Sequence, residues 1–113
     1  MSAALAGHLI AESGASKTDW VWLEGGVERA FVSEGFSIHV MGWDAVEAQL
    51  RAQVLPRLEG RTPAAVSYYG ASFSDGALCR RMEALLAACT GAPRVEVQED
   101  LVAAGRATWG RAM

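Results

Sequence analysis

The sequence has few cysteines, no excess of positive charge and no long apolar run, and each shortage excludes a class of protein. Its 113 residues include two cysteines, Cys79 and Cys89, which lie ten positions apart within one predicted helix. At a rise of 1.5 Å per residue they would be about 15 Å apart, beyond the reach of a disulfide bond. The spacing also fits neither a zinc knuckle nor an iron–sulfur site. We therefore expect two small buried or half-buried side chains.

Charge and hydrophobicity patterns argue against two kinds of partner. Ten basic and 13 acidic side chains give a net charge of −3, and the arginines are scattered, so no basic stripe is available for nucleic acid. The longest stretch without a charged residue, 62–74, is shorter than the roughly 18 residues of a membrane-spanning helix. No basic cluster precedes the apolar start, as it would in a secretory signal. We expect a cytoplasmic protein without nucleic-acid or membrane partners.

What is present predicts one α/β domain over residues 1–113, because 51% of the chain is hydrophobic and no linker divides it. An apolar run at 8–11, a β-branched and aromatic run at 18–23 and an alternating run at 27–33 predict a three-stranded meander. Gly25 and Gly26 mark the tight reversal between the last two strands.

The second part of the chain predicts helices alternating with strands. Apolar residues at helical spacing begin at Trp43, and Pro56 is expected to end or kink this helix near residues 53–55. A strand at 64–69, a helix at 75–89, a strand at 94–97 and a helix at 100–109 follow. The order βββαβαβα predicts a mixed five-stranded sheet with helices on both faces.

Three chain segments meet at the carboxyl edge of the parallel strands, where ligands bind in such sheets. They are 12–14, 70–72 and 99–100. The loop from Ser13 to Thr18 is either an ordinary hairpin turn or a cradle for phosphate, in which Lys17 adds positive charge. Asp100 is either a helix N-cap or a general base for phosphoryl transfer. Glu12 is either a solvent-facing carboxylate or the holder of a hydrated magnesium ion.

Four ordered blocks, at residues 10–20, 33–37, 68–71 and 99–107, resemble the N-acetylglucosamine kinase-like proteins. That family shares the actin/hexokinase/heat-shock ATPase fold with the activating ATPases of benzoyl-CoA reductase. The resemblance implies a ribonuclease H-like lobe and ATP-dependent phosphoryl transfer to the hydroxyl of an amino sugar.

The resemblance also implies roles for individual positions. Asp100 matches the catalytic base, and Glu12 stands where the family has the aspartate that organises Mg²⁺ through water. Ser37, Gly70 and Ala71 match positions beside the sugar. The loop that wraps the phosphates of ATP matches Ser13, Gly14, Ala15, Ser16, Lys17 and Thr18.

Departures from the family pattern keep other functions open. Glu12 replaces an aspartate, Ser37 replaces an asparagine, and the sequence stops at Met113 before the second phosphate loop and the adenosine-binding lobe. We therefore expect an N-terminal lobe that is inactive without its second lobe. The alternative is a non-catalytic subunit or binding module whose exposed lobe face is covered by self-association. An activating ATPase for a reductase is a further alternative, although Cys79 and Cys89 are poorly placed to bridge a cluster.

Overall fold

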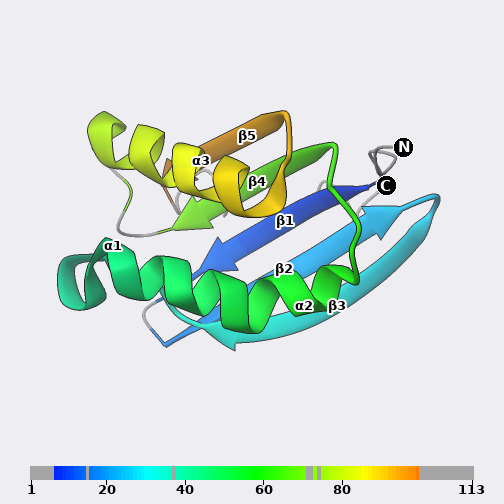
Figure 1. Cartoon of the computed structure of the whole chain (residues 1–113), viewed down its shortest axis with the longest axis horizontal. Helices are drawn as coiled ribbons and strands as arrows, with labels where there is room; N and C mark the ends of the chain where they lie inside the picture. The colour runs from blue at the N-terminus through cyan, green and yellow to red at the C-terminus, as the bar shows by residue number, and fades with distance from the viewer. Residues whose placement is uncertain (1–6, 15, 37, 71–72, 74, 100–113) are drawn as a thin grey trace.

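Five strands form one mixed sheet in the order β3-β2-β1-β4-β5 (Figure 1). The computed structural model describes residues 7–14, 16–36, 38–70, 73 and 75–99. β1 pairs antiparallel with β2, and β2 pairs antiparallel with β3, whereas β1, β4 and β5 run parallel. The strands are β1 (His8–Ser13), β2 (Lys17–Glu24), β3 (Val27–Glu34), β4 (Ala65–Gly70) and β5 (Arg94–Glu99).

The meander predicted from the sequence is confirmed, including its tight turn. Gly25 and Gly26 both have positive φ, 59° and 83°, and they connect Glu24 to its register partner Val27. A two-residue hairpin loop with two positive φ values is favourable for glycine and matches the twist of the flanking strands. The glycine pair therefore fixes the register of β2 against β3.

The first helical segment begins earlier than predicted and is divided into several pieces. α1 (Ile38–Gln49) begins before Trp43, and Gly42 interrupts it with φ 80° and ψ 166°. The end or kink predicted near residues 53–55 coincides with the start of α2 (Leu55–Leu58), and Pro56 lies in the first turn of that helix. A π-helical turn, η1 (Leu50–Val54), joins the two pieces, and the Leu55 N–H donates to the Leu50 carbonyl.

α3 (Gly76–Thr90) agrees with the prediction. Its N-cap is Asp75, whose side chain accepts a hydrogen bond from the Ala77 N–H at 2.7 Å. It ends at Gly91, which has φ 80°, a conformation that glycine adopts without strain. No helix within the described ranges is long and apolar enough to cross a membrane.

The described helices all lie on the same face of the sheet, in front of the strands in Figure 1. An aromatic cluster fills the space beneath them, and it consists of Trp20, Phe31, Phe36, Tyr68 and Phe73. The mixed five-stranded α/β sheet is confirmed. The prediction of helices on both faces depends on residues 100–109, which lie outside the described residues.

Gly70 lies where two rings of the aromatic cluster come close to the backbone of β4. A Cβ added there would lie 2.9 Å from Phe73 Cδ2 and 3.0 Å from Tyr68 Cε1. Because the tightly packed rings must shift, we expect Gly70→Ala to lower the free energy of unfolding by about 1–3 kcal/mol. Chemical denaturation measures this change. Gly14→Ala is the control, because its added Cβ meets only the Lys17 carbonyl at an ordinary 3.6 Å. Equal stability of the two variants would contradict this account of Gly70.

Candidate functional site at the carboxyl edge

The ends of three parallel strands meet at one edge of the sheet, as the sequence predicts. Ser13, the last residue of β1, is in register with Gly70, the last residue of β4, and Gly70 is in register with Glu99 at the end of β5. The loop after β1 and the end of β4 are therefore neighbours. Four predicted site residues lie outside the described residues: Ala15, Ser37, Ala71 and Asp100.

The hydroxyls of Ser13 and Thr18 are directed into the protein and not toward the outside of their loop. Both side chains are buried, and Ser13 Oγ lies 2.9 Å from Thr18 Oγ1. Thr18 donates to the carbonyl of Glu34 at 3.1 Å, and Ser13 Oγ accepts from the Phe36 N–H at 3.4 Å. These hydroxyls are thus engaged in interior hydrogen bonds.

A second branch of hydrogen bonds ends at the same carbonyl. The Trp20 indole N–H donates to Ser33 Oγ at 2.9 Å, and Ser33 donates to the Glu34 carbonyl at 3.1 Å. The first helical segment holds the remaining polar groups of Glu34. Its backbone N–H donates to Gln53 Oε1 at 2.9 Å, and its carboxylate accepts from Gln49 Nε2 at 3.4 Å. Glu34 is therefore held at its N–H, its carbonyl and its side chain.

The groups of the β1–β2 loop that face solvent are fewer than the sequence predicts. The Gly14 N–H closes the turn by donating to the Lys17 carbonyl at 2.8 Å. Ser16 and Lys17 are exposed, and the Lys17 ammonium lies 3.5 Å from a carboxylate oxygen of Asp19. Within the described part of the loop, Ser16 and Lys17 are the side chains available to an outside phosphate.

Glu12 has a carboxylate neighbour that the sequence analysis missed. Glu12 and Asp19 are directly paired in the β1–β2 register, so their side chains share one face of the sheet. Among the described residues, no group of three or more metal-binding side chains occurs. Magnesium commonly keeps several waters and uses one or two carboxylates together with substrate phosphates. The donor set therefore fits a hydrated Mg²⁺ at Glu12 and Asp19, but not a complete protein cage.

Tyr68 places a buried hydroxyl beside this edge, near the hydroxyl of Ser13. Its side chain is fully buried, and among the described residues its hydroxyl makes no hydrogen bond of normal geometry. Burial raises the pKa of Tyr68 well above its usual value, and the nearby Ser13 hydroxyl opposes that rise. Because the ring passes beside Gly70, the hydroxyl extends toward the carboxyl end of β4.

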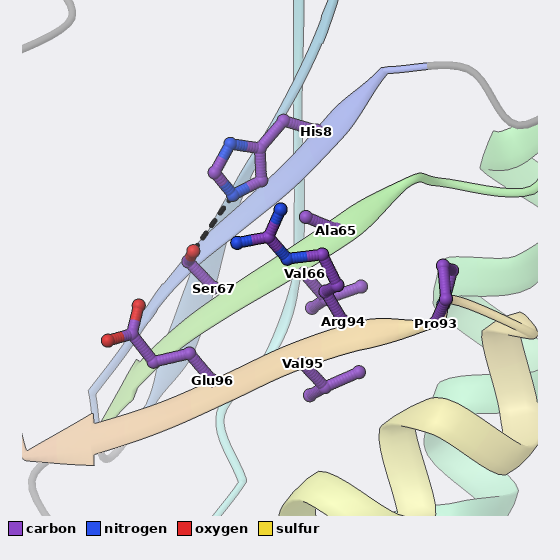
Figure 2. A pocket seen from close by; sticks show the side chains of 8 residues that line it. All are labelled: His8, Ala65, Val66, Ser67, Pro93, Arg94, Val95 and Glu96. Carbon is purple, nitrogen blue, oxygen red and sulfur yellow. Dashed lines mark hydrogen bonds between the residues drawn. The ribbon is translucent and has the colours of Figure 1, made fainter.

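A separate hollow of about 650 Å³ lies near the opposite ends of these strands (Figure 2). His8 Nε2 lies 2.8 Å from Ser67 Oγ there, and Arg94 and Glu96 project from β5 on the same side. Burial is the main cause that lowers the pKa of His8; Arg94 adds to this effect and Glu96 opposes it. The hollow takes in none of the predicted site residues.

Comparison with known proteins relates this geometry to a kinase. No protein-family model matches the sequence, and no curated protein matches it. A solved structure does match: the Putative N-acetylglucosamine Kinase of Porphyromonas gingivalis, with a TM-score of 0.80 and 29% sequence identity. The chain is similar to one lobe of an N-acetylglucosamine kinase-like protein. The match covers 90% of this chain but only 37% of the other, so this chain spans little more than a third of that protein's length.

The resemblance inferred from the four sequence blocks is thus confirmed at the level of the fold. The kinase-like lobe also contains interactions that the motifs did not indicate, namely the Glu34 contacts and the Tyr68 hydroxyl. Strand alternation is a signal that could have revealed the orientation of two hydroxyls. Ser13 follows the buried Leu9 and Ala11 at a spacing of two, and Thr18 precedes the buried Trp20 at the same spacing.

Removing the Tyr68 hydroxyl should stabilise the kinase-like lobe. A buried hydroxyl without a partner costs about 1–3 kcal/mol, so we expect Tyr68→Phe to raise the free energy of unfolding at pH 7 by about 1 kcal/mol. The effect should grow above pH 10, where the unfolded chain releases the tyrosine proton but the folded chain, with its raised pKa, retains it. Denaturation between pH 7 and 11 measures both effects. Tyr69→Phe is the control. Because it keeps Tyr68, its free energy of unfolding should still fall above pH 10. A destabilised Tyr68→Phe would contradict this interpretation.

Proposed function

We propose that the chain is the first lobe of an ATP-dependent kinase that phosphorylates a hydroxyl of an amino sugar resembling N-acetylglucosamine. The observation that carries the proposal is the match to the kinase structure, at 29% identity over 90% of the chain. The meeting of the loop after β1 with the end of β4 supports it, because α/β sheets bind ligands at such an edge.

The proposed roles of the described residues follow from their positions and chemistry. Lys17 and Ser16 are the exposed groups of the β1–β2 loop, so they contact the phosphates of ATP. Glu12 and Asp19 hold waters around the magnesium ion from one face of the sheet. When bound, magnesium–ATP supplies the phosphoryl group, and the metal ion neutralises charge on the phosphates. The family resemblance implies that Ser37, Gly70 and Ala71 contact the sugar.

Asp100 supplies the proton acceptor in this proposal. As the sugar oxygen bonds to the γ-phosphorus, the bond from that phosphorus to the bridging oxygen breaks, and ADP leaves with its electron pair. The proton of the sugar hydroxyl passes to the Asp100 carboxylate. A second lobe holds the adenosine and closes over the site, because phosphoryl transfer to a sugar rather than to water requires that water be excluded.

Titration of the isotope-labelled chain tests the binding part of this proposal. We expect magnesium–ATP to shift the amide resonances of Ser16 and Lys17, and N-acetylglucosamine to shift those of Gly35 and Phe36. Lys17→Ala should weaken nucleotide binding about 5- to 30-fold, because it removes the cation nearest the phosphates. Arg51→Ala is a matched control that removes an exposed cation paired with Glu47 on the first helical segment. If both variants bind nucleotide like the unchanged chain, Lys17 is not a phosphate ligand.

Turnover in the presence of a second lobe tests the role of Asp100. In an assembly that releases ADP in response to N-acetylglucosamine, we expect Asp100→Asn to lower kcat about 10²- to 10⁴-fold, because the amide cannot accept the proton. The KM for ATP should change little. Coupled measurement of ADP release gives both constants, and unchanged kcat would remove Asp100 from the mechanism.

A non-catalytic, self-associating module is the second candidate, and two exposed residues favour it. Val27 and Val32 on the edge strand β3 are 57% and 55% exposed. Apolar side chains beside unpaired strand groups favour pairing with another chain. Sedimentation of the chain alone distinguishes the candidates, because a monomer that binds nucleotide supports the kinase lobe and a dimer that does not bind it supports the module.

A further inference from the structure

The interior hydrogen bonds beneath the candidate site have a defined direction. A threonine hydroxyl has one proton, and Thr18 donates it to the Glu34 carbonyl. Thr18 Oγ1 can therefore only accept in its 2.9 Å contact with Ser13, so Ser13 is the donor. Ser13 Oγ in turn accepts from the Phe36 N–H. The series runs from Phe36 through Ser13 and Thr18 to Glu34, and we call these four residues the hydroxyl relay.

The hydroxyl relay joins two segments that the proposed function assigns to different ligands. Ser13 and Thr18 are the two ends of the loop proposed to contact ATP. Glu34 and Phe36 belong to the segment that leads from β3 to Ser37, which is proposed to contact the sugar. Phe36 is 2% exposed and packs edge-on against Trp20 with their ring centroids 6.3 Å apart, so its side chain anchors this segment in the core.

The π-helical turn secures the far end of the hydroxyl relay. Gln49 precedes that turn and Gln53 lies within it, and together they bind the side chain and the backbone N–H of Glu34. Ser33 supplies the second donor to the Glu34 carbonyl. Since all of these groups converge on one residue, a displacement of Glu34 strains the bond to Thr18 and thereby the loop.

We propose that the hydroxyl relay is a positioning device that couples the nucleotide loop to the sugar segment. Ser13 and Thr18 are then positioning residues and not phosphate ligands. This inference rests on the proposed function for the identity of the two ligands, but the mechanical coupling belongs to the chain itself. Ligand binding at either segment is transmitted to the other because the two segments share a buried, fully directed set of hydrogen bonds.

Amide hydrogen exchange tests the coupling without any ligand. In Thr18→Val, which keeps the shape but removes the acceptor of Ser13, we expect the Phe36 amide to exchange at least about threefold faster relative to the Val66 amide of β4. Expressing the Phe36 rate relative to the Val66 rate corrects for any change in global stability. Thr18→Ser, which retains the hydroxyl, should restore slow exchange. Thr90→Val is the matched control, because it deletes a buried threonine hydroxyl whose bonds to Leu86 and Ala92 lie outside the relay.

A second variant tests the coupling from the opposite end and does not alter the core. Gln53→Ala removes the acceptor of the Glu34 N–H. The Gly14 amide lies in the loop on the other side of the relay. We expect this amide to exchange about threefold faster relative to the Val66 amide. If Phe36 in Thr18→Val and Gly14 in Gln53→Ala both keep their normal relative exchange rates, the relay does not couple the segments and the proposal is overturned.

Ligand titration separates failure of this inference from failure of the proposed function. With magnesium–ATP, the unchanged chain should show shifts at Ser16 and Lys17 that extend to Gly35 and Phe36, and in Thr18→Val the shifts should stay within the loop. Absence of any shift with ATP counts against the proposed function, while the exchange rates still decide the relay. Shifts that reach Phe36 equally in both proteins overturn the relay and leave nucleotide binding intact.

Discussion

The Glu34 carbonyl, where β3 ends, is the point on which the candidate site depends. It accepts hydrogen bonds from Thr18 of β2 and from Ser33 of its own strand, so both of its lone pairs are engaged. Each buried donor would lose its partner if this carbonyl moved, and an unpaired buried polar group is costly. The carbonyl thereby fixes the loop after β1 relative to the segment after β3, and the helix above the sheet is bound to the same residue.

The aromatic cluster makes this polar arrangement possible. Trp20 stacks parallel to Phe31 with a centroid distance of 6.0 Å, and it also donates its indole N–H to Ser33. Its ring therefore excludes water while its N–H completes the hydrogen bonds beneath the loop. In such a low-dielectric environment each bond is stronger than it would be in water. The packing of the core and the geometry of the site thus share the same side chains.

Much of the fold could be predicted from the sequence because its signals are local. The glycine pair at 25–26 determines a turn, and alternating or apolar runs determine the strands beside it. The meeting of β1, β4 and β5 at one edge follows from their parallel order. Pro56 indicated the break near residues 53–55, but the π turn that precedes it was not predicted. Gln53 of that turn contacts Glu34, 19 positions away, and no local pattern encodes such a contact.

The site was predicted less completely than the fold. Ser13 and Thr18 could contact a phosphate only if their hydroxyls faced outward, and strand alternation turns both inward. The contacts of Glu34 join residues 15 to 19 positions apart and carry no motif. Asp100, Ser37 and Ala71 remain predictions from the family resemblance, since they lie outside the described residues.

The π-helical turn at Leu50–Val54 gives the length of this helix a particular significance. A π turn is an α-helical turn that contains one additional residue. Loss of a single residue from this stretch would regularise the helix, and each residue of an α-helix turns the direction of the next by about 100°. The amide of Gln53 would then point away from the end of β3. The two pieces of this helix can therefore diverge in sequence at many surface positions, but an insertion or deletion between them would separate the helix from the site.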